Sequence, residues 1–282
     1  MGFELGALLG NLGDGSQSFD SFPTDTWSVN IVGGPITVTS DNTNTYSSNG
    51  SLKSTTTALA TFASAEFSHA YASCDDLYQR WWFEVGTHDI ATYVSGKVSG
   101  GSQNAYLRAG LNGTAVGCYG LATDVYSRYR YSATLNSADN YEIILEVNRP
   151  FGGGAQTIHL DDVTTVIDPI QLFPEWDLKL KDELFMTDHQ TVGGASPSYV
   201  WGFNKKWDVP LTHIEENQAR LLNQWWQDMR PLLFTADTSD YTQQFIVTMT
   251  NKQTPMNNFS KVYHDEWRGT LELAAYDTSL IF

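Results

Sequence analysis

The chain has 282 residues, including 9 Trp, 14 Tyr and 14 Phe, and a formal net charge of −16 from 32 acidic and 16 basic side chains. A surface this acidic repels phosphate backbones and anionic lipid, which argues against nucleic-acid binding and membrane docking. No stretch approaches the roughly 18 apolar residues of a membrane-spanning helix, and the first ten residues lack the basic region of a signal peptide. We therefore expect neither membrane insertion nor ordinary export.

Residues 1–15 are rich in Gly and Leu without a clear period, and they predict an arm that is either loose or docked on a partner. Residues 16–169 break into short strand-like runs separated by Ser, Thr, Asn, Asp and Gly. Such runs, without a helical period between them, predict an antiparallel β-sandwich or jelly roll that closes near Asp168-Pro169. The expected strands are Trp27–Val32, Ile36–Thr39, a strand from Ser51, Tyr78–Val85, Ala91–Val98, Ala105–Leu111, Tyr126–Ala133 and Tyr141–Val147.

An early and a late segment of this region, Asn49–Lys53 and Ile158–Val163, are expected to meet across a sheet. The late segment contains Asp161-Asp162, and adjacent strand residues face opposite sides, so one acid points toward the core or a sheet edge. A buried carboxylate must be paired, protonated or bound to a cation. Asp20, Asp161 and the carbonyls near Asn49 could hold Ca²⁺. Alternatively, the strand bulges and both acids reach water.

The aromatic residues of the same region are candidate sugar contacts. In a strand, Trp81-Trp82 directs one ring inward and the other outward, and an outward ring can stack on the apolar face of a sugar. Trp27 and Tyr129, together with Tyr126 and Tyr131, can do the same. The alternative for each ring is simple core filling.

Residues 170–282 predict a small α+β domain with one main helix. Thr212-His213-Ile214-Glu215 has the form of a capping box, and Pro231 ends the helix that follows. Strands are expected at Leu178–Met186, Tyr199–Phe203, Trp207–Pro210, Gln244–Met249 and Gly269–Leu273. The helix contains Trp225-Trp226, and adjacent helix positions diverge by about 100°, so one ring should contact a second surface, either a neighbouring sheet or another subunit. Trp207, Trp225 and Trp226 are the candidate assembly contacts.

Catalytic motifs are not recognisable. Nothing matches a nucleophile elbow, a phosphate-binding loop or a zinc-protease helix. Cys74 and Cys118 do not form a metal-type pair, and their pairing with each other is left open. The sequence therefore predicts a non-enzymatic protein.

The first region resembles carbohydrate-binding modules of the family 4/9 type, which are galactose-binding-like jelly rolls. The residues that carry this resemblance are Phe19-Asp20, Trp27-Ser28-Val29, Ser48–Lys53 and Leu160–Val163. The resemblance implies a structural calcium ion near the first strand and the Asp-Asp strand, which would involve Asp20 and Asp161 in this chain. It also implies that aromatic residues bind glycan.

The second region is similar to the small C-terminal domains of bacteriophage tail and baseplate proteins. The residues behind this similarity are Trp201-Gly202-Phe203, Trp207–Ile214, Leu221–Trp226, Pro231–Thr235, Thr250-Asn251-Lys252 and Gly269–Leu273. The two resemblances together imply a structural protein of a virion, assembled in the host cytoplasm and placed at a tail tip, baseplate or tail appendage. Its expected partners are other tail proteins, further copies of itself in the symmetry of the tail, and glycan on the host surface. The alternative is a free carbohydrate-binding protein or an accessory module of a polysaccharide-degrading enzyme.

Overall fold

A computed structural model of the chain describes residues 2–8, 16–17, 28–33, 36–41, 43, 51–56, 63–71, 88–100, 106–111, 114–135, 141–149, 155–173, 179–188, 198–241, 243–258 and 267–275. The chain divides into two compact units, Leu8–Pro169 and Met1–Ala7 with Ile170–Phe282, which we call the sandwich unit and the helical unit. The expected boundary lay near Asp168-Pro169.

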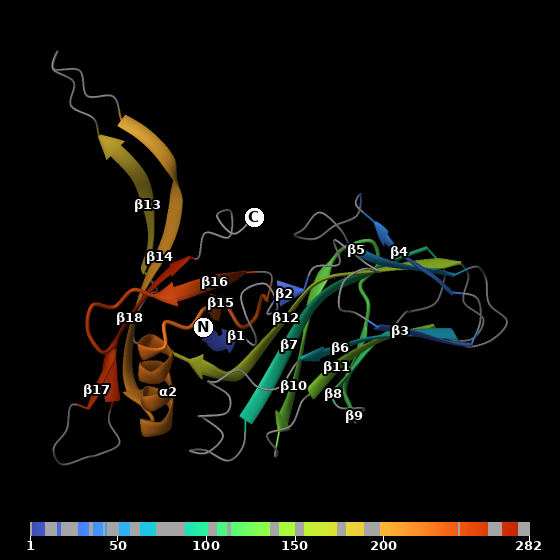
Figure 1. Cartoon of the computed structure of the whole chain (residues 1–282), viewed down its shortest axis with the longest axis horizontal. Helices are drawn as coiled ribbons and strands as arrows, with labels where there is room; N and C mark the ends of the chain where they lie inside the picture. Colours follow the sequence, from blue (N-terminus) through green and yellow to red (C-terminus); the bar gives the residue numbers. More distant parts are fainter. Residues whose placement is uncertain are drawn as a thin grey trace. The chain divides into compact units, whose positions relative to one another are not determined.

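The sandwich unit consists of two antiparallel sheets, which Figure 1 shows as layers. In the first sheet the strand order is β10-β7-β12-β5-β4, with β2 also beside β12; in the second it is β3-β6-β11-β8-β9. The strands are β2 (Ser16–Gln17), β3 (Ser28–Gly33), β4 (Ile36–Asp41), β5 (Ser51–Thr56), β6 (Ala63–Tyr71), β7 (His88–Ser99), β8 (Tyr106–Leu111), β9 (Thr114–Gly120), β10 (Ser127–Leu135), β11 (Tyr141–Arg149) and β12 (Gln156–Leu172).

The mainly β architecture predicted from the sequence is confirmed, and so is its long-range pairing. β12 pairs with β5 in antiparallel register, with Leu160 opposite Leu52 and His159 opposite Lys53. The alternation of β12 separates two faces. Ile158 and Leu160 are fully buried on the inner face, whereas His159 shares the outer face with Lys53 and with Lys97 of β7.

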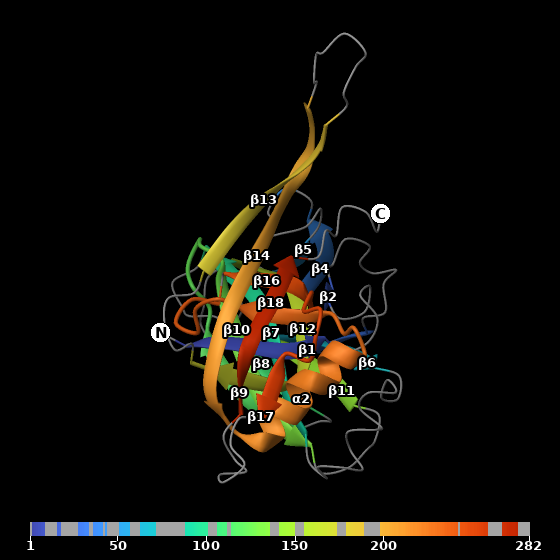
Figure 2. The same cartoon turned by 90° about the vertical axis from the view of Figure 1, so that its left-hand side faces the viewer.

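The helical unit contains an antiparallel sheet in the order β1-β15-β16-β18-β14-β13, with β17 also beside β18. One described helix, α2, lies beside β17, where Asn223 exchanges hydrogen bonds of 3.0 Å with the backbone of Met256 (Figure 2). The elements are β1 (Phe3–Leu8), β13 (Lys179–Asp188), β14 (Ser198–Ile214), α2 (Glu216–Gln227), β15 (Leu232–Thr235), β16 (Gln244–Met249), β17 (Met256–Asn258) and β18 (Trp267–Ala275).

The N-terminal residues differ from the expected arm. Residues 3–8 form β1, which pairs with β15 and is buried along its whole length. Phe3 and Leu5 are at most 1% exposed, and the Phe3 ring packs edge-on against Phe234, with ring centroids 5.6 Å apart. Apolar side chains at alternating positions explain why this segment joins a sheet.

The start of the helix also differs from the prediction. Residues 198–214 form one continuous strand, β14, so Thr212 and His213 belong to the strand and no capping box forms. The helix begins at Glu216, and Glu215 at its N-cap makes no side-chain capping bond. It ends at Gln227, before Pro231, through Met229 N–H donating to the Trp226 carbonyl and Arg230 N–H to the Trp225 carbonyl. These two bonds form a Schellman motif, in which Met229 has a positive φ of 50°.

β13 and β14 extend together away from the rest of the helical unit (Figures 1 and 2). Residues 206–214 of β14 pair with β18, whereas Ser198 to Lys205 pair with β13 alone among the described strands. Within the described ranges, no helix has the length and apolar character that crossing a membrane requires.

Candidate functional site

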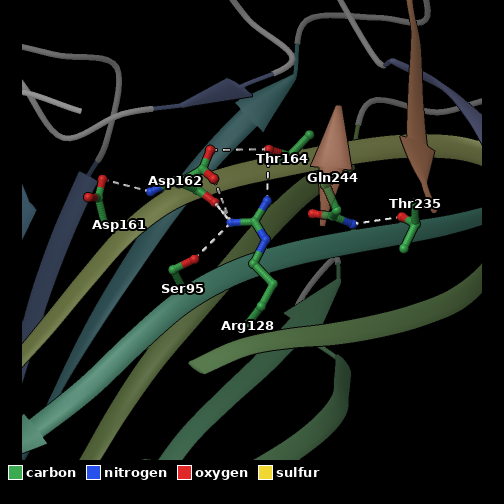
Figure 3. Close-up of polar contacts among 7 residues, drawn as sticks. All are labelled: Ser95, Arg128, Asp161, Asp162, Thr164, Thr235 and Gln244. Carbon is green, nitrogen blue, oxygen red and sulfur yellow. Dashed lines mark hydrogen bonds and ion pairs between the residues drawn. The ribbon is translucent and has the colours of Figure 1, made fainter. Parts of the chain in front are cut away.

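The Asp161-Asp162 pair lies at a bulge in β12. The register against β7 shifts between Asp161 and Thr164, and Asp162 adopts a left-handed φ of 49°. Asp161 is completely buried, and its Oδ1 accepts a hydrogen bond of 2.8 Å from the backbone N–H of Asp162. The Asp161 carboxylate therefore caps the backbone of the bulge, and the left-handed backbone of Asp162 takes its side chain out of the regular strand alternation (Figure 3).

Arg128 of β10 supplies the cation for this bulge. Its side chain is only 3% exposed, and its Nη1 lies 3.0 Å from Oδ2 of Asp162. The guanidinium also donates to the Asp162 carbonyl, to Ser95 Oγ at 3.0 Å and to Thr164 Oγ1 at 3.2 Å (Figure 3). Five N–H donors in a fixed plane suit such a divided set of acceptors. The alternative in which both acids reach water is wrong for Asp161, although the bulge itself is present.

Of the residues predicted to bind calcium, the structure describes Asp161. Asp20 and Asn49 lie outside the described residues. Among the residues that the structure does describe, no three His, Cys, Asp or Glu side chains gather as metal ligands. Asp162 does not suit a cation because its carboxylate already faces Arg128, whereas the buried carboxylate of Asp161 is of the right chemical type. Calcium binding through Asp161 stays a prediction.

Tyr129 is one of the candidate sugar contacts that the structure describes, and it belongs to a tyrosine cluster. Its ring centroid lies 5.6 Å from that of Tyr119 in β9, whose ring in turn lies 5.3 Å from that of the buried Tyr131. Tyr119 is 39% exposed and Tyr129 is half-buried. The tryptophan candidates, Trp27, Trp81 and Trp82, lie outside the described residues.

Hydrogen bonds fix the rings of Tyr119 and Tyr129. The Tyr119 hydroxyl donates to the carbonyl of Arg130 at 2.7 Å. The Tyr129 hydroxyl accepts from the backbone N–H of Ala122 at 2.9 Å and donates to the carbonyl of Gly120 at 3.3 Å. Because both phenol groups are tied to the backbone, the rings lose little conformational freedom when a ligand stacks on them. We call Tyr119 and Tyr129 the tyrosine pair.

A second polar cluster lies on the outer face of the first sheet. Oδ2 of Asp41 accepts from Nε2 of His159 at 3.2 Å and pairs with Nζ of Lys53 at 3.3 Å, while Oδ1 accepts from Thr43. Burial lowers the pKa of His159 from its ordinary value of 6.5, the bond to Asp41 opposes this, and the charge of Lys97 adds to the lowering. The ring is therefore neutral at pH 7, with its hydrogen on Nε2.

The predicted assembly tryptophans lie inside the helical unit. Trp207 and Trp225 are 2% and 1% exposed, and the Trp207 ring packs between Phe234 and Phe245, with centroids 5.1 and 4.9 Å away. Both rings lie in the core of the helical unit, so the prediction that Trp207 and Trp225 are surface contacts is wrong. Trp226 is half-buried, and its Nε1 donates to the carbonyl of Asn251 at 2.9 Å. The two adjacent helical rings do diverge, and the second surface includes this chain's own loop.

Sequence reasoning missed Arg128, Tyr119 and the Asp41–His159 pair. The alternation of β10 gives a partial signal for Arg128, because it pairs opposite Ser95 and so lies on the same face as Asp161. Asp161 and Tyr129 do not form one site, since Asp161 lies on the outer face and Tyr129 pairs opposite the inner-face residue Val94.

No known protein family matches the chain, and no curated protein sequence matches it. Among solved structures it is similar to the CBM22-1 xylan-binding domain of Xyn10C from Paenibacillus barcinonensis, with 17% identity and a TM-score of 0.35 over 54% of this chain and 92% of that one. It is similar to the C-terminal family 22 carbohydrate-binding module of Xyn10B from Clostridium thermocellum, with 12% identity and a TM-score of 0.35 over 54% and 91% of the two chains.

A third similar structure is the enzymatically active domain of tailspike protein 4 from bacteriophage CBA120. The identity is 18% and the TM-score 0.36, over 57% of this chain and 21% of that one. Likenesses at these identities concern the fold, and no function is transferred from them. The resemblance to modules of the 4/9 type stays a prediction from the sequence.

Proposed function

We propose that this chain is a non-enzymatic structural protein of a bacteriophage virion. In this proposal the sandwich unit contacts glycan on the host surface, and the helical unit docks onto other tail proteins in repeated copies that follow the symmetry of the tail. The resemblance of residues 170–282 to tail and baseplate domains supports the location in the virion. The tyrosine pair is the observation that carries the glycan contact.

The chemistry of the tyrosine pair suits a sugar. The apolar C–H face of a pyranose ring packs on an aromatic plane, and polar groups around the plane hold its hydroxyls. Tyr119 exposes 39% of its surface although it is one of a buried cluster, and its hydroxyl is held at 2.7 Å by a backbone carbonyl. An exposed ring that is held in place by other rings and by the backbone is a preformed stacking surface rather than core filling.

In this proposal the helical unit docks through the extended hairpin of β13 and β14. Ser198 to Lys205 of β14 pair with β13 alone among the described strands, so this part of β14 has one backbone edge without a described partner strand. Such an edge can pair with a strand of another subunit. Of the three candidate assembly tryptophans, Trp226 is half-buried and so has surface available for contact.

The glycan contact is tested with the full-length protein and its single variants Tyr119→Ala and Tyr129→Ala, by affinity electrophoresis in gels that contain soluble polysaccharides. Loss of one stacking ring should weaken binding roughly tenfold, by analogy with a base stacked on an aromatic side chain, which contributes about 1–3 kcal/mol. Tyr241→Ala is the matched control, because Tyr241 is a half-buried tyrosine in the helical unit, outside the tyrosine pair. Retention of binding in Tyr119→Ala and in Tyr129→Ala would refute the role of the tyrosine pair.

The competing function is a free carbohydrate-binding protein, which the same tyrosine pair would also serve. Mass spectrometry and immunogold electron microscopy of purified phage particles separate the two. The protein should be present in the particles in a multiple that matches tail symmetry. Its recovery only as a soluble monomer would refute the virion location and leave the free binding protein.

We also propose a structural calcium ion held by Asp161 with Asp20 and the backbone near Asn49. The support is the complete burial of the Asp161 carboxylate together with the sequence resemblance. A chelator should lower the melting temperature of the wild-type protein, and this effect should disappear in Asp161→Asn. An equal melting temperature with and without chelator would contradict the proposal.

A further inference from the structure

The loop between β9 and β10, residues 121–126, is held against the tyrosine pair. The backbone N–H of Ala122 donates to the Tyr129 hydroxyl at 2.9 Å. On the side of β7, the N–H of Val98 donates to the Ala122 carbonyl at 2.9 Å, and the N–H of Asp124 donates to the Val98 carbonyl at 2.8 Å. The backbone of the loop is therefore fixed beside the tyrosine pair before any ligand binds.

The side chains of this loop are exposed next to the stacking rings. Thr123 and Asp124 are exposed, and Val125 exposes 65% of its surface. Among the described residues five large apolar side chains are exposed, and two of them, Tyr119 and Val125, lie within this one stretch of chain. The Asp124 carboxylate makes no hydrogen bond or ion pair with any residue that the structure describes. A hydroxyl, a carboxylate and apolar surface thus lie beside a preformed ring, and small-molecule sites combine groups of these kinds.

We propose that Asp124 determines the class of sugar bound at the tyrosine pair, because its carboxylate accepts hydrogen bonds from two adjacent hydroxyls of a neutral glycan. This assignment rests on the proposed glycan contact and adds the class of sugar to it. An ionised carboxylate only accepts hydrogen bonds, and its two oxygens match the two donors that neighbouring sugar hydroxyls offer. A uronate or a sulfated sugar would place a like charge against Asp124, in a chain whose net charge is −16.

Asp124 lies within reach of a sugar stacked on Tyr129. An extended chain spans at most about 3.6 Å per residue, so the Cα of Asp124 is no more than about 7 Å from the Cα of Ala122. The N–H of Ala122 in turn contacts the Tyr129 hydroxyl. One sugar ring and the aspartate side chain together bridge a separation of this size.

The backbone of Asp124 allows binding to be separated from structure. Its φ of 59° lies in the left-handed region, which glycine adopts without steric cost and which Asn and Asp tolerate better than other residues. Asp124→Asn therefore keeps the backbone and the shape of the side chain while it removes the charge. Asp124→Gly removes the carboxylate and should leave the melting temperature unchanged or raise it.

The test measures the affinity of the full-length protein for neutral xylan, for dextran and for polygalacturonate by isothermal titration calorimetry. The wild type should prefer a neutral polymer. Its affinity for that polymer should fall roughly tenfold in Asp124→Asn and in Asp124→Gly, since a hydrogen bond to a charged group is stronger than one between neutral groups. The matched control is Glu215→Gln, because Glu215 is an exposed carboxylate of the helical unit that makes no side-chain capping bond.

The outcomes separate the role of Asp124 from the proposed function. Binding of none of the three polymers would refute both. If Tyr119→Ala abolishes binding while both Asp124 variants keep the wild-type affinity, the glycan contact stands and the role of Asp124 is overturned. A wild type that prefers polygalacturonate would also overturn it. A melting temperature that falls in Asp124→Gly together with the affinity would assign the carboxylate a structural role, and an equal loss of affinity in Glu215→Gln would assign the effect to net charge; either result contradicts the proposal.

Discussion

Removal of the Arg128 side chain should destabilise the sandwich unit. It is 3% exposed and pairs with Asp162 at 3.0 Å, and it also donates to Ser95, to Thr164 and to the Asp162 carbonyl. Removal of one partner of a buried ion pair costs about 3–5 kcal/mol. Since the Asp162 side chain is 20% exposed and water can replace part of the pairing, we expect Arg128→Met to lower the free energy of unfolding by about 3 kcal/mol.

The comparison with Arg128→Lys separates charge from geometry. A lysine keeps the charge, but its donors lie on a single nitrogen instead of a planar guanidinium whose Nη1 and Nη2 both bind here, so about 2 kcal/mol should still be lost. In a double-mutant cycle, Arg128→Met combined with Asp162→Asn should show a coupling of about 1–2 kcal/mol. Ser132→Ala is a suitable control, because Ser132 lies on the same strand and is exposed.

The assay is urea unfolding of the full chain, followed by circular dichroism and by hydrogen exchange of peptides from β7, β10 and β12. Peptide resolution is needed because the chain has two compact units, and a single two-state transition cannot be assumed. The loss should be confined to peptides of the sandwich unit. A loss below about 1 kcal/mol for Arg128→Met, or a coupling near zero with Asp162, would refute the view that the guanidinium holds the bulge.

Three further changes test other parts of the structure. Met229→Gly should raise the free energy of unfolding of the helical unit by about 1 kcal/mol, because Met229 is 83% exposed and has a φ of 50°. A lower free energy of unfolding, measured by urea denaturation, would contradict this. Gly269→Ala should lower it by more than about 2 kcal/mol, since the new Cβ would stand 1.8 Å from the Pro255 carbonyl, whereas Gly120→Ala should be neutral. Burial lowers the pKa of His159 in the folded protein, so below pH 6.5 the unfolded state binds a proton more readily than the folded state. The contribution of His159 to stability is therefore fully present above pH 6.5 and is lost as the pH falls below it. Melting temperatures of His159→Gln, measured over the same pH range, should lack this part of the decline.

The sequence predicted the sandwich well because its signals are local or repeat along the chain. Period-2 runs located β3, β7, β8, β10 and β11, and the early and late segments do pair, with Leu52 opposite Leu160. The runs that were missed carry weaker patterns. β6 includes Ala63-Ser64-Ala65-Glu66 and β9 includes Gly117, residues with low strand propensity that are held by pairing on neighbouring strands.

The helix start shows where local reasoning fails. Thr212 and Glu215 have the spacing of a capping box, yet β14 continues to Ile214 because Ile214 still pairs with Trp267 of β18. Pairing between residues 53 positions apart prevails over a local capping preference that is worth about 1 kcal/mol. The prediction of Trp225 as a surface contact failed for a related reason, since the periodic pattern identifies a buried face without showing which sheet covers it.

The site residues were less predictable because they depend on register. Asp161 and Asp162 are adjacent in the sequence, but their different roles follow from a bulge that Arg128, 34 residues away from Asp162, stabilises from another strand. Similarly, Asp41 and His159 are separated by 118 residues and meet because β4, β5 and β12 lie side by side. Without the strand pairing, the sequence shows the chemical types of these residues but does not show their partners.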